Sequence, residues 1–363
     1  MGAVTAYPSD KIGCYQDLNY TYSVTVTGNA NPPAIEVDVI INTEFYRTIF
    51  LATYETLTVV SSNYVYTFNI NIADAVQSYF DNNEFLHSAT RSYPYFATDL
   101  TANVVLDVHD YLPDVDGVLT RDASGFRSSS RLFFNSLQND MTDYTASTGR
   151  KFMTTNEYYR LSKQCTNTLA VFADSNADTI RIATTAATTD ISLTRDKINI
   201  INLNDYFDAN TVILRAYVGT LDNSDFIQTG EMIEYRFMTE ECEPIFLHFQ
   251  NILGTSEVFM FKNYEYEILQ EIQRDNFVTS NNKVKMFEGQ LDKVISVNRE
   301  GFFVKEWENF RQVNTSAVFK IEEDFIIEDV YANYRRTPFR TANNEIDVSL
   351  EFVYSDEQKI FSN

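Results

Sequence analysis

The clearest pattern along the chain is an alternation of apolar and polar residues, which is typical of strands that bury one face. Six stretches show this alternation, and they cover residues 20–26, 35–41, 64–72, 104–108, 212–218 and 346–354. In the first stretch, Tyr20, Tyr22, Val24 and Val26 alternate with polar residues. The pattern predicts a mainly β protein.

Stretches whose apolar residues have helical spacing are fewer and shorter than those that alternate. Apolar residues at steps of three and four predict a helix over 72–80 and another over 302–313, in which Trp307 and Phe310 share a face. A third candidate runs over 156–165. The predicted helices are therefore connectors between strands.

One sequence segment occurs twice in similar form. Residues 70–74 and 79–81 (INIAD and YFD) resemble residues 201–208 (INLNDYFD), and an alternating strand follows each copy. A strand, a short helical element and a strand used twice is one interpretation, and a chance match is the other. In the first interpretation, Asn82–Leu100 is a long insertion of the kind that carries recognition on a β scaffold.

Domain boundaries fall best in two polar stretches, Gln138–Thr148 and Arg274–Asn282. We therefore expect a β-sandwich with a long loop insertion over residues 1–140, a second β-sandwich over 141–275 and a small α+β unit over 276–363. The fold class predicted is tandem antiparallel sandwiches of immunoglobulin or fibronectin type.

Composition narrows the function. With 44% hydrophobic and 14% aromatic residues, the chain can bury a core. Its net charge of −23 disfavours nucleic acid and anionic membranes as partners. The sequence contains neither a long apolar run nor the features of a signal peptide, so we expect a chain made in the cytoplasm without export.

The residues that usually perform catalysis are scattered. Three cysteines and three histidines lie far apart, and no nucleotide-binding or hydrolase motif is present. Glutamates flank Cys242 and should raise its pKa, while His248 is expected on the polar face of a strand. These features predict a protein that is not an enzyme and has neither cofactor nor metal.

Two groups of residues can carry binding. The acidic run Asp107–Asp116 could hold Ca²⁺ or form a solvated strand end. Aromatic and basic residues give interface candidates, with burial within the chain or a solvated loop as the alternative. The candidates are Tyr93, Tyr95 and Phe96 in the insertion, Trp307 and Phe310 on the predicted helix, and Arg335 and Arg336.

The run Glu240–Gly254 (EECEPIFLHFQNILG) carries a resemblance. An acidic segment with a cysteine, a strand, an Asn-x-Leu-Gly turn and an aromatic strand at Val258–Phe261 is similar to segments of tail, baseplate and fibre-associated proteins of tailed phages and related injection particles of Bacteroidetes hosts. The resemblance covers about residues 200–360 and implies assembly surfaces rather than an active site.

Two functions follow as hypotheses. The first is a non-enzymatic virion structural subunit of a phage tail, baseplate, neck or fibre attachment, which would bind copies of itself and other virion proteins. The alternative is a carbohydrate-binding or adhesive β-sandwich that takes a host surface glycan and depends on Ca²⁺ at Asp107–Asp116.

Overall fold

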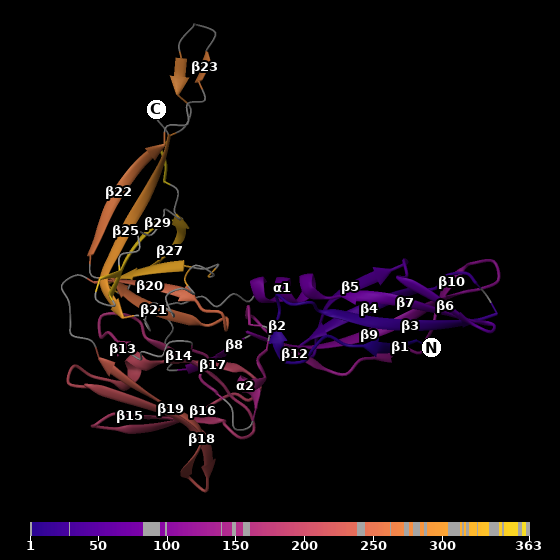
Figure 1. Ribbon diagram of the computed structural model, residues 1–363, viewed down its shortest axis with the longest axis horizontal. Coiled ribbons are helices and arrows are strands. Elements are labelled where there is room, and N and C mark those ends of the chain that lie inside the picture. The colour runs from indigo at the N-terminus through magenta and orange to yellow at the C-terminus, as the bar shows by residue number, and fades with distance from the viewer. Residues whose placement is uncertain are drawn as a thin grey trace.

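The chain forms three β units that meet in one region, and the first unit projects away from the other two (Figure 1). The computed structural model describes residues 2–28, 30–82, 95–98, 100–138, 140–146, 150–154, 160–237, 244–261, 263–271, 276–278, 284–286, 289–303, 313, 316, 319–324, 326–333, 341–342, 345–354 and 358–360. The mainly β prediction is confirmed, with tandem antiparallel sandwiches in the first two units.

The first unit is a sandwich of two sheets. One sheet has the order β1 (Ala3–Ala6), β3 (Asn19–Thr27), β7 (Asn63–Asn71) and β6 (Thr56–Val60). The other has the order β2 (Ile12–Gly13), β12 (Arg131–Phe134), β9 (Thr101–Pro113), β4 (Ala34–Ile41) and β5 (Glu44–Leu51), and β10 (Leu119–Arg121) and β11 (Phe126–Arg127) also pair with β9. Apart from β2, which lies beside β12, these orders match the A-B-E-D and G-F-C-C′ sheets of an immunoglobulin-type sandwich.

The alternating pattern places the core of this sandwich between its sheets. Along β3, Tyr20, Tyr22 and Val24 are buried, and the polar residues between them are partly exposed. The predicted helix at 72–80 is confirmed as α1 (Ala73–Asn82), which follows β7 directly. The side chain of Asn71 starts this helix, because its Oδ1 accepts a hydrogen bond of 2.8 Å from the backbone N–H of Ala73.

The second unit repeats the plan. Its larger sheet has the order β13 (Arg160–Leu161), β19 (Asp225–Phe237), β18 (Ile213–Asp222), β15 (Thr179–Ala183) and β16 (Thr188–Ser192). Its smaller sheet has the order β14 (Thr168–Phe172), β17 (Ile198–Asn202) and β8 (Tyr95–Thr98). The sequence echo is therefore a structural one, because β17 passes through the 3-10 helix η1 (Leu203–Tyr206) to the opposite sheet, as β7 passes through α1.

Strand β8 comes from the insertion of the first sandwich but completes the second. It pairs antiparallel with β17 from Thr98 opposite Ile198 to Tyr95 opposite Ile201. In the immunoglobulin plan this is the D position of the second sandwich, next to its E strand. Part of the predicted recognition loop is thus a strand that ties the two sandwiches together.

The third unit contains a nine-stranded sheet. Its order is β21 (Ser256–Phe261), β20 (Ile245–Gln250), β26 (Phe319–Glu323), β27 (Ile326–Asn333), β29 (Glu345–Tyr354), β25 (Gly289–Phe303) and β22 (Asn263–Glu271), and β28 (Thr341–Ala342) and β30 (Gln358–Ile360) pair with β29 and β25. The remaining strands, β23 (Asn276–Val278) and β24 (Val284–Met286), form a separate hairpin.

Two predictions for this part of the chain need correction. Because β20 pairs with β26, the third unit begins at Ile245 and the predicted boundary at 275–276 falls inside it. The polar stretch mistaken for a linker includes β23 of the hairpin. Phe302 and Phe303 lie in β25, so the helix predicted over 302–313 does not begin there. Among the described helices, none has the length and apolar character needed to cross a bilayer.

Candidate functional site

The three units meet in an apolar cluster between the sandwiches. Leu100 and Phe134 come from the first sandwich, Phe172 and Ile200 from the second, and Leu253 from the third unit. Met141 and Tyr144 enter from the connecting segment with the helix α2 (Thr142–Thr145). The rings of Phe134 and Phe172 meet edge to face at 5.6 Å between centroids.

The turn Asn251–Gly254, which carries part of the phage resemblance, joins the third unit to the first sandwich. Asn251 Oδ1 accepts the backbone N–H of Leu253 at 2.9 Å and that of Thr255 at 3.1 Å, which shapes the turn. Gly254 has a φ of +83°, and a Cβ there would lie 1.5 Å from the carbonyl oxygen of Asn135. Only glycine suits both this conformation and this close approach.

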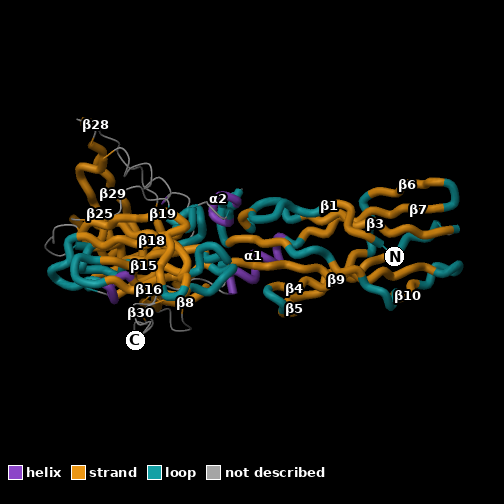
Figure 2. The backbone as a smooth tube through the Cα atoms, turned by 90° about the horizontal axis from the view of Figure 1, so that it is seen from below, coloured by secondary structure: helices purple, strands orange, loops and turns teal. Residues whose placement is uncertain are grey.

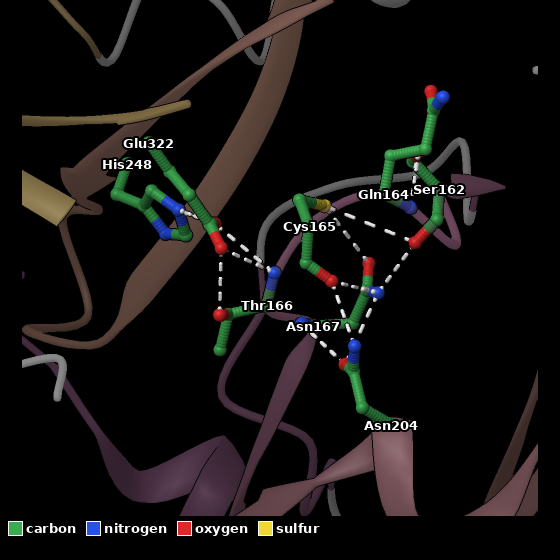
Figure 3. A network of polar contacts seen from close by, with 8 residues as sticks. All are labelled: Ser162, Gln164, Cys165, Thr166, Asn167, Asn204, His248 and Glu322. Carbon is green, nitrogen blue, oxygen red and sulfur yellow. Dashed lines mark hydrogen bonds and ion pairs between the residues drawn. The ribbon is translucent and has the colours of Figure 1, made fainter. Parts of the chain in front are cut away.

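A buried carboxylate joins the third unit to the second sandwich (Figure 3). Glu322 on β26 is fully buried and accepts hydrogen bonds from the backbone N–H of Thr166 at 2.9 Å and from its hydroxyl at 2.8 Å. His248 Nε2 on β20 lies 2.6 Å from Glu322 Oε2. The face of β20 that carries His248, which was expected to be the polar face of the strand, is therefore covered by the second sandwich.

Next to this carboxylate, two asparagines hold the Ser162–Asn167 loop (Figure 3). Asn167 Nδ2 donates to the carbonyl of Ser162 at 2.7 Å, and Asn204 Nδ2 donates to the carbonyl of Cys165 at 2.8 Å. Burial, and secondarily the charge of Glu322, raises the pKa of the Cys165 thiol well above its usual value. Cys165 is therefore held as a neutral thiol and is a poor nucleophile.

A buried lysine fixes the connecting segment to the second sandwich. Lys151 Nζ donates to Asp174 Oδ2 at 2.5 Å and to the carbonyl of Ala146 at 2.7 Å. Its backbone N–H and that of Phe152 both donate to Glu231 Oε1 at 2.9 Å. The residue serves as a bridge between elements.

These contacts define one arrangement, which we call the joint: the apolar cluster, the Asn251–Gly254 turn, the Glu322 contacts and Lys151. Within it, Glu322 links the third unit to the second sandwich, His248 links β20 to β26, and Lys151 links the connecting segment to the second sandwich. These buried polar side chains therefore connect separate parts of the chain.

The acidic run predicted as an alternative Ca²⁺ site is dispersed. Asp110 is buried and accepts from the Tyr22 hydroxyl at 2.8 Å and from the Gly2 backbone at 2.7 Å. Asp107 pairs with Arg127, while Asp114 caps its own turn by accepting from the Val118 backbone at 2.8 Å. Over the described residues, no group of three or more metal-ligating side chains comes together.

The predicted interface residues fall in two groups. Tyr95 and Phe96 lie on β8, whose backbone pairs with β17 inside the chain. The other candidates lie outside the described residues: Tyr93, Trp307, Phe310, Arg335 and Arg336. Their contact with a partner stays a prediction.

The sequence patterns did not predict most of the residues that form the joint. Glu322 and Glu323 are adjacent in the strand. The sequence does not show that Glu322 is buried and that Glu323 is partly exposed. Lys151 follows the polar stretch at 138–148, and nothing in the local sequence marks its side chain as buried. The only usable signal was the Asn-x-Leu-Gly turn at 251–254, whose glycine indicates a special backbone conformation.

Comparisons with known proteins leave the function open. No family model matches the sequence, and no curated protein matches it. Among solved structures, extracellular domains 3–5 of Drosophila OTK align over 81% of this chain and 94% of that chain, with 11% identity and a TM-score of 0.18. A similarity of that size carries no argument about function.

Proposed function

We propose that this chain is a non-enzymatic structural subunit that acts through protein–protein contacts, in a virion of the tailed-phage type. The observation that carries the proposal is the joint. Among the described residues, the buried carboxylate of Glu322 holds Thr166 across the contact between the third unit and the second sandwich, and the apolar cluster takes residues from all three units. A rigid multi-unit body is what an assembly needs from its subunit.

The virion setting rests on the sequence resemblance over Glu240–Gly254. The turn at the end of that run is a structural element of the joint, with Gly254 against Asn135. The resemblance therefore concerns how the units are connected, which supports an architectural role.

Light scattering of the purified chain over a concentration series, followed by negative-stain imaging of any larger species, tests this proposal. A discrete symmetric oligomer is the expected result. A chain that stays monomeric at every concentration, and that instead shows a thermal shift with Ca²⁺ or binds glycans, would contradict it and favour the adhesive alternative.

A further inference from the structure

Strand β6 is an open edge of the first sandwich. All five of its residues, Thr56–Val60, are exposed, and among the described strands it pairs only with β7. Figure 2 shows it at the rim of the sandwich. Leu57 and Val59 keep 41% and 55% of their surface exposed. An edge strand with exposed apolar side chains is a ready template for another strand.

The segment around β6 carries almost no charge, which favours a partner whose contacting surface is also uncharged. The chain has a net charge of −23, yet Glu55 is the only charged residue from Thr48 to Ala73. The neighbouring edge strand β5 carries Glu44 and Arg47, charges of the kind that blunt an edge. Two copies of this acidic chain repel one another over most of their surface, and β6 is an edge where they can approach without facing charges.

The register of β6 also suits a second copy of itself. Val60 pairs with Asn63 across the turn Ser61–Ser62, and a two-residue hairpin closes on a hydrogen-bonded pair. Hydrogen-bonded and non-hydrogen-bonded pairs then alternate, so Leu57 and Val59 direct their N–H and C=O groups away from β7. In an antiparallel pair of β6 strands centred on Thr58, Leu57 of each copy lies opposite Val59 of the other, and these free groups meet.

We propose that two copies of this chain pair through β6, antiparallel about a two-fold axis at Thr58. The four-stranded sheet of each copy then continues into one sheet of eight strands. Leu57 and Val59 share a face with the buried Tyr66, since Leu57 is its register partner, and the second copy covers their exposed apolar surface. This inference rests on the assembly function and names the first contact of that assembly.

A disulfide tests the axis. In this register Thr58 faces Thr58 of the second copy as a non-hydrogen-bonded pair, with Cα atoms about 4.5 Å apart, which a disulfide can span. Thr58→Cys should therefore crosslink to a covalent dimer under mild oxidation. Val60→Cys is the matched control, because the two copies of residue 60 lie about 14 Å apart along the strands. Both variants carry Cys242→Ser, since Cys14 and Cys165 are buried.

A charge swap tests the register without a crosslink. Leu57→Lys puts an ammonium on the apolar contact and should weaken the dimer at least tenfold in sedimentation equilibrium. Adding Val59→Glu should restore it, because the new ammonium of each copy then lies opposite the new carboxylate of the other. Val118→Lys, at an exposed position on the β9–β10 hairpin, should leave the dimer unchanged. Circular dichroism confirms that each variant is folded.

The possible results distinguish failure of the β6 pairing from failure of the proposed assembly function. A Thr58→Cys crosslink with rescue by the charge swap supports the pairing. Equal crosslinking of both cysteine variants, or none in Thr58→Cys, overturns it. If larger assemblies persist when the edge variants have no effect, the assembly function stands and this contact falls; if no association occurs in any variant, both fall.

Discussion

The two sandwiches share a strand plan but take their D strands from different parts of the chain. In the second, the D position is filled by β8 from the first, and Lys151–Met153 lies along the outer side of β14, where the backbone of Met153 donates to Ala170 and that of Phe172 donates to Lys151. In the first, the D strand β6 has no described neighbour beyond β7. The second sandwich therefore takes its D strand from the insertion of the first, whereas the first forms its own D strand, and both β8 and β6 end their sheets among the described strands.

The largest effect should come from the joint that fixes these two sandwiches to the third unit. Gly254→Ala combines a positive φ with a Cβ against the backbone of Asn135, and we expect a loss of about 3–5 kcal/mol in the free energy of unfolding. Gly117→Ala is the matched control. Its φ is +81°, but its nearest neighbour is the side chain of Asn31 at 3.7 Å, so the cost should be about 1 kcal/mol. Equal losses in urea titrations would contradict the close approach.

Removing strand β8 from the second sandwich should have the next largest effect. Replacing Tyr95–Thr98 with Gly-Ser-Gly-Ser weakens the ladder to β17, and we expect the second sandwich to lose about 2–4 kcal/mol. Replacement with Thr-Val-Thr-Val keeps strand propensity and should preserve most of this stability. Hydrogen exchange at Ile198–Asn202 reads the effect directly. Unchanged protection in the Gly-Ser variant would show that β8 does not stabilise β17.

At the open edge, the effect on folding should be small. Val59 is 55% exposed, so Val59→Lys should change the free energy of unfolding by no more than about 0.5 kcal/mol. The same change should lower the association measured by light scattering, because it places a charge on the edge. A large loss of stability in thermal unfolding would mean that β6 is needed within its own sandwich.

Acid should affect the second sandwich more than the first. Hydrogen bonds from neighbouring side chains lower the pKa values of three carboxyl groups there. Arg181 donates to Asp190, Thr211 to Asp208 and Arg215 to Glu234. A carboxyl whose folded pKa is lowered contributes stability that is present at neutral pH and is lost as pH falls through that pKa, which is below about 4. The first sandwich has Asp122 as such a group. Segment-resolved hydrogen exchange at low pH should show the second sandwich opening first.

At high pH, the first sandwich should open before the second. Burial is the main cause that raises the pKa values of Tyr20 and Tyr22 in the first sandwich, and for Tyr22 the hydrogen bond to Asp110 adds to it. These groups contribute stability below the unfolded tyrosine pKa of about 10, and it is lost as pH rises above that value. Tyrosinate absorbance should appear together with opening of the first sandwich. Early opening of the second would contradict this assignment.

The alternating pattern was enough to predict the β fold and four of its strand cores, since burial on one face leaves a period of two along β3, β4, β7 and β9. In β29, Phe352 and Tyr354 are buried. In β18, Leu214, Ala216 and Val218 are buried as predicted, but Val212 is exposed because it precedes the strand. Contacts between units could not be predicted. Glu322, His248 and Lys151 are buried by distant segments, and no local pattern records which segment will cover them.

Hydrogen exchange of the wild-type chain at low and high concentration tests the pairing of two β6 strands most directly. We predict that the amides of Thr58 and Val60, which face β7 in the same chain, are protected at both concentrations. The amides of Leu57 and Val59, which face away from β7, should gain protection only at high concentration. Protection of Leu57 and Val59 that does not change with concentration would contradict the claim that this edge pairs with a second copy.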